Sequence, residues 1–135
     1  MKTEILTLCD YAQDNNGKLT IIGTFNVISS RAFPFTQTIF YIVARVAFEK
    51  GEIGDFPLKC SITEHSKNIE LASLSGTCHV AQPDKGFATL NILFPIPQLS
   101  FTEPGSFLVI LSIGESSFEL PLTVVKIAES NTINK

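Results

Sequence analysis

The sequence predicts an all-β protein: a single-domain antiparallel β-sandwich of Greek-key, Ig-like or C2-like type, with about eight strands. Short runs of β-branched and aromatic residues alternate with turn signals made of Gly, Pro, Asn and Asp. No helical period extends over a stretch long enough for a helix, and 44% of the residues are apolar. A small barrel is the second architecture that this pattern allows.

The chain is organised around a hairpin in Thr3–Ile28. Its polar centre ends in Asn16-Gly17, a dipeptide that accepts the positive φ angles of a tight hairpin turn. The flanking runs, Ile5–Tyr11 and Leu19–Ile28, supply the apolar and β-branched residues of two strands.

A crossing loop and a buried strand follow the hairpin. Ser29–Phe35 contains Pro34, which disfavours a continuous central strand, so we expect a loop there. Thr38–Glu49 is apolar at both alternating registers, which predicts a strand covered on both faces. Arg45 interrupts that strand and needs a carboxylate or carbonyl partner if it is buried. The alternative is an arginine at the sheet margin with its guanidinium in water.

The middle of the chain predicts further strands. Phe56–His65 alternates between apolar and polar residues, which indicates a half-buried strand. Ile69–Gln82 is long and has Gly76 near its middle, which suggests a bulge or a bend between two sheets. Phe87–Phe94 is a strand, whereas the prolines in and beside Ile96–Glu103 predict a loop.

A second hairpin closes the domain. Ser106–Ile113 and Phe118–Ile127 both alternate, and Gly114–Ser117 joins them. The apolar pattern then stops. We therefore expect one domain over residues 1–128 and a disordered C-terminal tail over residues 129–135.

Composition argues against several function classes. The net charge is −3 and the ten basic residues form no cluster, so no cationic stripe is present for nucleic acid. No apolar run reaches the length of a membrane span. Three cysteines, Cys9, Cys60 and Cys78, lie inside apolar runs. This odd number is typical of buried free thiols in a reducing compartment, so the cytoplasm is the expected location.

No residue pattern predicts catalysis, a metal or a cofactor. Cys78 and His79 are neighbours, and neighbouring side chains on a strand point to opposite faces, so they cannot form a thiol–imidazole dyad. Cys60 and His65 also differ by an odd number and lack the paired spacing of a zinc site. We therefore expect no catalytic, cofactor-binding or metal-ligating residues and no enzymatic activity.

Four polar residues are the candidates for a binding site. Asp10 and Tyr11 end the first strand beside the turn, and Arg31 or Arg45 could complete a polar mouth with them. The structural alternative is that Asp10 accepts backbone N–H bonds that fix the turn.

Two segments resemble a family of small uncharacterised bacterial proteins. The N-terminal pattern is L-x-L-C-D-Y-A at Leu6–Ala12, followed by N-G-K-L-T-I-I-G-T-F-N-V-I at Asn16–Ile28, and E-P-G-S-F at Glu103–Phe107 precedes the second hairpin. The resemblance implies a single-domain β-sandwich of bacterial, cytoplasmic origin. It implies no activity, cofactor or site residue.

We therefore predict a non-enzymatic module that interacts with a protein partner or with copies of itself, through open sheet edges or an apolar sheet face. The alternative is a small-ligand-binding protein or hydrolase with a pocket at one end of the sandwich, near Asp10, Tyr11 and Arg31. The sequence does not identify the ligand.

Overall fold

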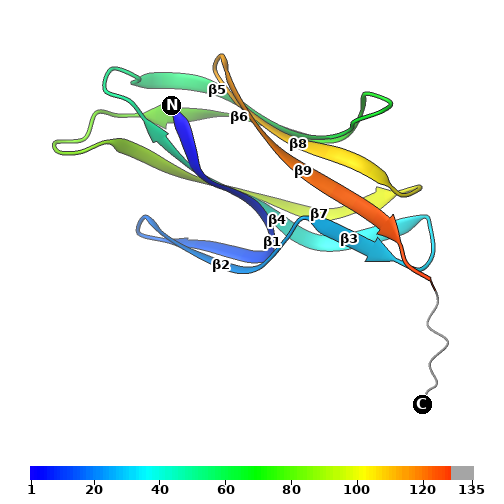
Figure 1. The fold of residues 1–135 in the computed structure, drawn as a ribbon. Helices are drawn as coiled ribbons and strands as arrows, with labels where there is room; N and C mark the ends of the chain where they lie inside the picture. The colour runs from blue at the N-terminus through cyan, green and yellow to red at the C-terminus, as the bar shows by residue number, and fades with distance from the viewer. Residues whose placement is uncertain (129–135) are drawn as a thin grey trace.

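The computed structural model describes residues 1–128, which form two facing β-sheets (Figure 1). The predicted tail, residues 129–135, lies outside the described residues. The strands are β1 (Lys2–Asn15), β2 (Lys18–Phe25), β3 (Val27–Ser30), β4 (Phe35–Phe48), β5 (Gly54–Glu64), β6 (Ile69–Val80), β7 (Ala88–Phe101), β8 (Gly105–Ile113) and β9 (Ser116–Lys126).

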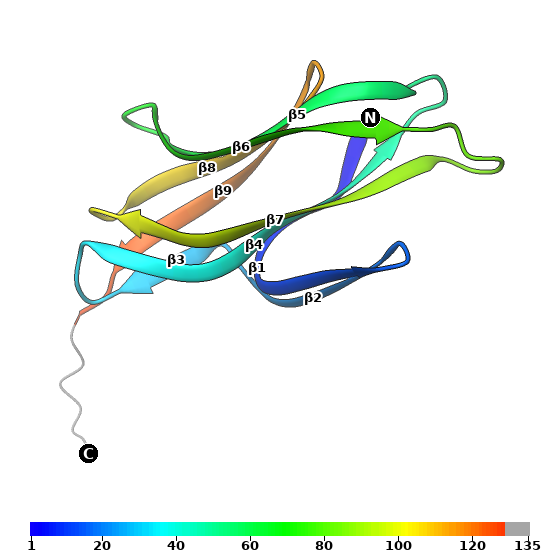
Figure 2. The same ribbon diagram turned by 180° about the vertical axis from the view of Figure 1, so that it is seen from behind.

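The two sheets pack as a sandwich and do not close into a barrel. Sheet A has the order β2-β1-β4-β7 and sheet B has the order β3-β9-β8-β5-β6. All neighbouring strands are antiparallel except β3 and β9, which run parallel. The predicted β-sandwich is therefore confirmed, with nine strands in place of about eight. Figure 2 shows the same two layers from behind.

The main core lies between the sheets and comes from alternate residues of each strand. The largest of the fully buried side chains are Phe40, Phe48, Phe101, Leu8, Ile42, Ile62, Leu111, Ile113 and Leu122. Burying a side chain of this size contributes about 1.5–3 kcal/mol. Phe101 and Phe107 meet edge to face, with ring centroids 5.1 Å apart, and thereby join the two sheets.

The N-terminal hairpin forms as predicted. β1 and β2 pair as far as Asn15 and Lys18, and Asn16 and Gly17 between them have φ angles of 53° and 87°. The predicted second run of this hairpin is divided, however. It leaves sheet A at Asn26, and Val27–Ser30 joins β9 of sheet B as the parallel strand β3. The crossing between the sheets therefore begins earlier than the predicted loop.

The far half of this hairpin bends out of sheet A. β1 pairs with β4 only as far as Cys9, and the rest of β1 pairs only with β2. Cys9 and Ala12 are three residues apart, yet both contact the same small cluster, so the strand changes direction between them. Gly23, opposite this point, has a φ of 71°, and a Cβ there would lie 2.4 Å from Asp10 Oδ2. The bend therefore requires glycine.

The bent hairpin covers the outer face of sheet A. In Figure 1 it lies on the side of β4 and β7 that faces away from sheet B. Val43 of β4 is fully buried there, beside Cys9 and Ala12, with Leu19, Ile21 and Leu93 packed around them. The prediction that this strand is covered on both faces is confirmed at Val43, where the hairpin covers the second face, but is wrong at Ile39, which is 56% exposed.

Two predictions for the middle of the chain are wrong. Ile96–Glu103 is not a loop, because β7 continues through Pro95 and Pro97 to Phe101 and pairs with β4 on both sides of the prolines. Gly76 marks no passage between sheets, since it pairs with Leu58 in a regular part of the β5–β6 ladder. The register shift in this ladder lies near Ile62 instead.

The C-terminal hairpin confirms its prediction. β8 and β9 pair from Gly105 and Val124 to Ile113 and Ser116, with a short turn at Gly114. The inward rows alternate as expected, since Phe107, Val109, Leu111 and Ile113 are all buried. Within residues 1–128, no helix is long and apolar enough to cross a membrane.

The bend at Gly23 gives a first testable prediction. Replacing Gly23 by Ala adds a Cβ that meets the Asp10 carboxylate and forces a non-glycine residue into positive φ. We expect the free energy of unfolding, measured by urea denaturation, to fall by about 1–3 kcal/mol. In the double variant with Asp10→Ala, only the backbone strain remains, so the two losses should be less than additive. Full additivity would contradict the contact.

Candidate functional site

The structure does not gather the four predicted polar residues into one site. Asp10 lies at the hairpin bend, Tyr11 beside it on β1 and 43% exposed, Arg31 in the loop between β3 and β4, and Arg45 near the end of β4. The cavity that Asp10 lines, about 270 Å³, includes none of the other three. A pocket built from Asp10, Tyr11 and Arg31 is therefore not formed.

Asp10 and Tyr11 have contacts that explain them structurally. The Asp10 carboxylate lies against Gly23. The Tyr11 hydroxyl donates to Gln13 Oε1 at 2.9 Å, and its ring meets Tyr41 edge to face with centroids 5.7 Å apart. The turn N–H that the sequence assigned to Asp10 is instead accepted by Asp14, whose Oδ1 is 2.8 Å from Gly17 N.

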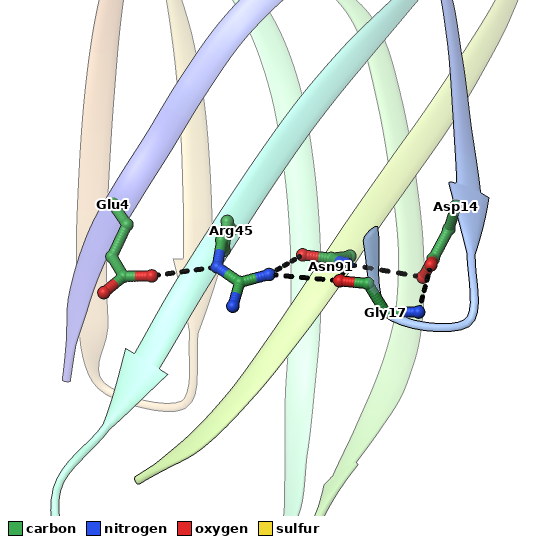
Figure 3. A network of polar contacts seen from close by, with 5 residues as sticks. All are labelled: Glu4, Asp14, Gly17, Arg45 and Asn91. Atoms are coloured by element: carbon green, nitrogen blue, oxygen red, sulfur yellow. Dashed lines mark hydrogen bonds and ion pairs between the residues drawn. The ribbon is translucent and has the colours of Figure 1, made fainter. Parts of the chain in front are cut away.

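Arg45 holds the tip of the bent hairpin on sheet A (Figure 3). Its Nε donates to Glu4 Oε1 at 2.9 Å, and its Nη1 lies 3.1 Å from Asn91 Oδ1 and 3.4 Å from the carbonyl oxygen of Gly17. Asn91 Nδ2 also donates to the Gly17 carbonyl at 3.1 Å and reaches Asp14 Oδ2 at 3.5 Å. β1, β4, β7 and the turn thus meet in one polar network.

The guanidinium of Arg45 is therefore partnered, and the alternative of a head group free in water does not hold. About one third of its side chain is exposed. An ion pair of such exposure contributes little by itself, but the donors to Gly17 and Asn91 also satisfy a turn carbonyl that packs over the sheet. The sequence shows the Arg and its need for a partner, but not that Glu4, Asn91 and the Gly17 carbonyl would supply it.

A cavity lies next to this network. Its volume is about 560 Å³. The side chain of Phe87, 76% exposed, stands at its wall. The remaining wall is formed by Met1, Lys2, Glu4, Arg45, Ala47, Phe48, Glu49 and Thr89. Cations and carboxylates are mixed here, so the cavity favours no single ligand charge.

The cysteines are free thiols buried in the fold, as the sequence predicts. Burial raises the pKa of the Cys60 thiol from 9.0 to about 12 and raises the pKa values of Cys9 and Cys78 as well. Thiols with raised pKa values are poor nucleophiles at neutral pH. His79 Nδ1 instead lies 2.5 Å from Asp55 Oδ1 on the exposed face of sheet B. Within residues 1–128, no group of three or more His, Cys, Asp and Glu side chains could hold a metal ion.

Most margins of the two sheets are protected against further strand pairing. Because the β4–β7 ladder runs past Pro95 on both sides, the N–H groups that Pro95 and Pro97 lack belong to the free side of β7. On this side of sheet B the last strand is β3, which is only four residues long. Where β3 does not cover β9, Pro121 leaves a gap on the outer side, since Thr123 N, two residues later, donates outward to Asn26. The edge of β2 is broken by the positive φ of Gly23.

β6 is the other outer strand of sheet B. Beyond the register shift near its start, it contains no proline and no kink that would block pairing with another strand. The Pro57 carbonyl accepts from Gly114 N, so Pro57 faces β8 and its neighbour Leu58 faces β6. Leu58 pairs with Gly76, and the residues on either side of Gly76 therefore point their N–H and C=O groups away from β5. These outward residues are Ser73, Ser75, Thr77 and His79, all exposed.

The sequence contains the signal for this edge, namely small hydroxyl residues alternating with Leu and Gly. It does not show that the strand would lie at the end of sheet B. β6 is therefore the part of the described structure best suited to bind another strand.

Comparison with known proteins identifies the family. Residues 4–125 match a family of unknown function (DUF6941), and the chain belongs to this family. No curated protein matches the chain.

The Arg45 network predicts a stability effect that is confined to the hairpin. Arg45→Met removes the donors to Gly17 and Asn91, so we expect unfolding to become easier by about 1–2 kcal/mol. Amide hydrogen exchange should accelerate over residues 10–22 and stay unchanged in β8 and β9. The matched control, Arg31→Met, changes an exposed loop residue and should stay within about 0.5 kcal/mol of the parent. Equal effects of both variants would count against the network.

The buried thiols predict a loss of stability at alkaline pH. The Cys60 pKa is 9.0 ordinarily and about 12 in the folded protein, so the thiol is protonated in both states below pH 9. As pH rises from 9 towards 12, only the unfolded chain loses this proton, and the free energy of unfolding falls. Urea denaturation at increasing pH measures this, with Cys60→Ala as the variant whose pH slope should be shallower. An unchanged slope in Cys60→Ala would show that other groups cause the loss.

Proposed function

We propose that this member of a family of unknown function is a non-enzymatic interaction module that binds a protein strand along the free edge of β6. The observation that carries the proposal is the unprotected row of backbone groups at Ser73, Ser75, Thr77 and His79, on a sandwich whose other edges carry prolines, a kink or only the four-residue strand β3. Added strands gain main-chain hydrogen bonds along such an edge, and the side chains of alternate residues provide specificity.

The properties of the polar and reactive groups agree with a binding role. The Cys9, Cys60 and Cys78 thiols are buried and protonated at neutral pH. Arg45, the most connected polar candidate, has the structural task of holding the hairpin. Free buried thiols also suit a reducing compartment, so we place the protein in the cytoplasm of a bacterial cell, in line with the family resemblance.

A second candidate function is small-ligand binding in the 560 Å³ cavity beside Arg45. The exposed ring of Phe87 at its wall favours this candidate, since an aromatic surface in water gains from covering. Native mass spectrometry of the purified chain separates the two functions. A retained small molecule supports the cavity, and a co-purifying protein or a dimer of the chain itself supports the β6 edge.

The edge proposal predicts that a proline in β6 abolishes partner binding. Thr77→Pro removes an outward N–H and leaves the ladder to β5 intact. The tagged chain, purified from the cells that produce it, should retain its protein partner in the parent and lose it in Thr77→Pro.

The matched control is Ser117→Pro, which removes an N–H from the outer side of β9 and should keep the partner. Thermal melts establish that both variants are folded. Retention of the partner by folded Thr77→Pro would overturn the proposal.

A further inference from the structure

Gly76 has no role that the chain itself explains. Six of the eight glycines have positive φ angles, which require glycine at those places, but Gly76 is extended. A glycine inside a strand costs stability, because it loses much conformational freedom and packs no side chain. A Cβ built on Gly76 would meet no atom within 4 Å, so no neighbour in the chain demands its absence. The missing side chain leaves an open notch beside the free edge of β6.

The same edge carries a side chain that fits this notch. Along β6, Leu74, Gly76, Cys78 and Val80 lie in the row that faces the core. Cys78 and Val80 are buried, whereas Leu74 is only half-buried and Gly76 is exposed. The protruding Leu74 side chain, which we call the knob, and the notch at Gly76 therefore lie two residues apart on β6.

We infer that β6 binds the β6 strand of a second copy of this chain, in an antiparallel pair centred on Ser75. A twofold axis pairs a strand with itself only in the antiparallel sense. With Ser75 opposite its own copy, Ser73 lies opposite Thr77, and Leu74 lies opposite Gly76 of the partner. Leu74 of each copy thus fills the notch at Gly76 of the other copy. A register two residues away in either direction places Leu74 against Leu74 or Gly76 against Gly76 and loses this match.

Charge and side-chain size favour the same arrangement. Parallel pairing would oppose Glu70 to Glu70, whereas the antiparallel register centred on Ser75 places Glu70 opposite Val80 and leaves the pairs Glu70–Lys59 and His79–Asp55 within each copy. The outer face of the pair consists of Ser73, Ser75 and Thr77, whose hydroxyls hydrogen-bond across strands and do not obstruct approach. Two copies then form one continuous sheet through their B sheets.

This inference rests on the proposed function, because it names the partner that binds the β6 edge. Its first test is Gly76→Val, which fills the notch. The extended φ and the empty space allow Val in the monomer, so its melting temperature should be equal or higher. Because overpacking occurs twice in the dimer, its dissociation constant in sedimentation equilibrium should rise at least about tenfold. Thr77→Ser is the control on the outer face of the same strand; it keeps the hydroxyl and fills no space at Gly76, so it should leave the constant unchanged.

A disulfide tests the register. Residues opposite each other in a hydrogen-bonded pair have Cα atoms about 5.5 Å apart, within the range of a disulfide. Under mild oxidation, Ser75→Cys should therefore form a covalent dimer, and Ser73→Cys, which faces Thr77, should not. The native cysteines are buried and do not compete.

A parent chain that is monomeric at every concentration, or a Gly76→Val variant that dimerises as tightly as the parent, would overturn the inference. Equal crosslinking of Ser73→Cys and Ser75→Cys would overturn the register. Any of these results leaves the edge open to a different protein, which the Thr77→Pro purification tests separately.

Discussion

Backbone N–H and C=O groups at the margins of a sheet have to be paired, covered or interrupted, and this constraint organises the molecule. Sheet A ends at β7, where Pro95 and Pro97 remove outward donors, and at β2, which Gly23 kinks. Sheet B is closed beside β9 by the short parallel strand β3 and by Pro121. Three margins are thus protected by three different means. The fourth margin, β6, has no such protection and is therefore the edge open to another strand.

The bend at Gly23 solves a second problem, the cover of the outer face of sheet A. β4 is apolar on both faces, and a two-layer sandwich covers only one of them. By folding back, the hairpin buries Val43 and Cys9 and adds a local third layer. This layer places the carbonyl group of Gly17 against the sheet, where it needs hydrogen-bond donors. Arg45 and Asn91 supply them. An arginine in an apolar strand is therefore explained by the packing of the hairpin rather than by a ligand.

The sequence predicts what depends on local pattern. Asn16-Gly17 defines the first turn, and the alternation in Ser106–Ile113 defines the buried row of β8, because both signals act over a few residues. The effect of a proline depends on the side of the strand to which it points. Pro97 therefore predicts a loop from sequence and yet lies inside β7. The candidate site is harder still to predict, because an edge is a property of strand order, and the network that holds the hairpin turn joins Arg45, Asn91 and Gly17, which are far apart in the chain.

Gly76 shows the difference between a local sequence signal and a property of strand order. In sequence it indicates a bulge or a bend, since those are the local reasons for glycine in a strand. In the structure it is extended, regularly paired and surrounded by free space, so both local reasons fail. What remains is close approach by another molecule, at a margin whose backbone groups are unpaired within the described chain. A residue that lowers the stability of the isolated domain, at the margin left unprotected, is better explained by an assembly than by the domain itself.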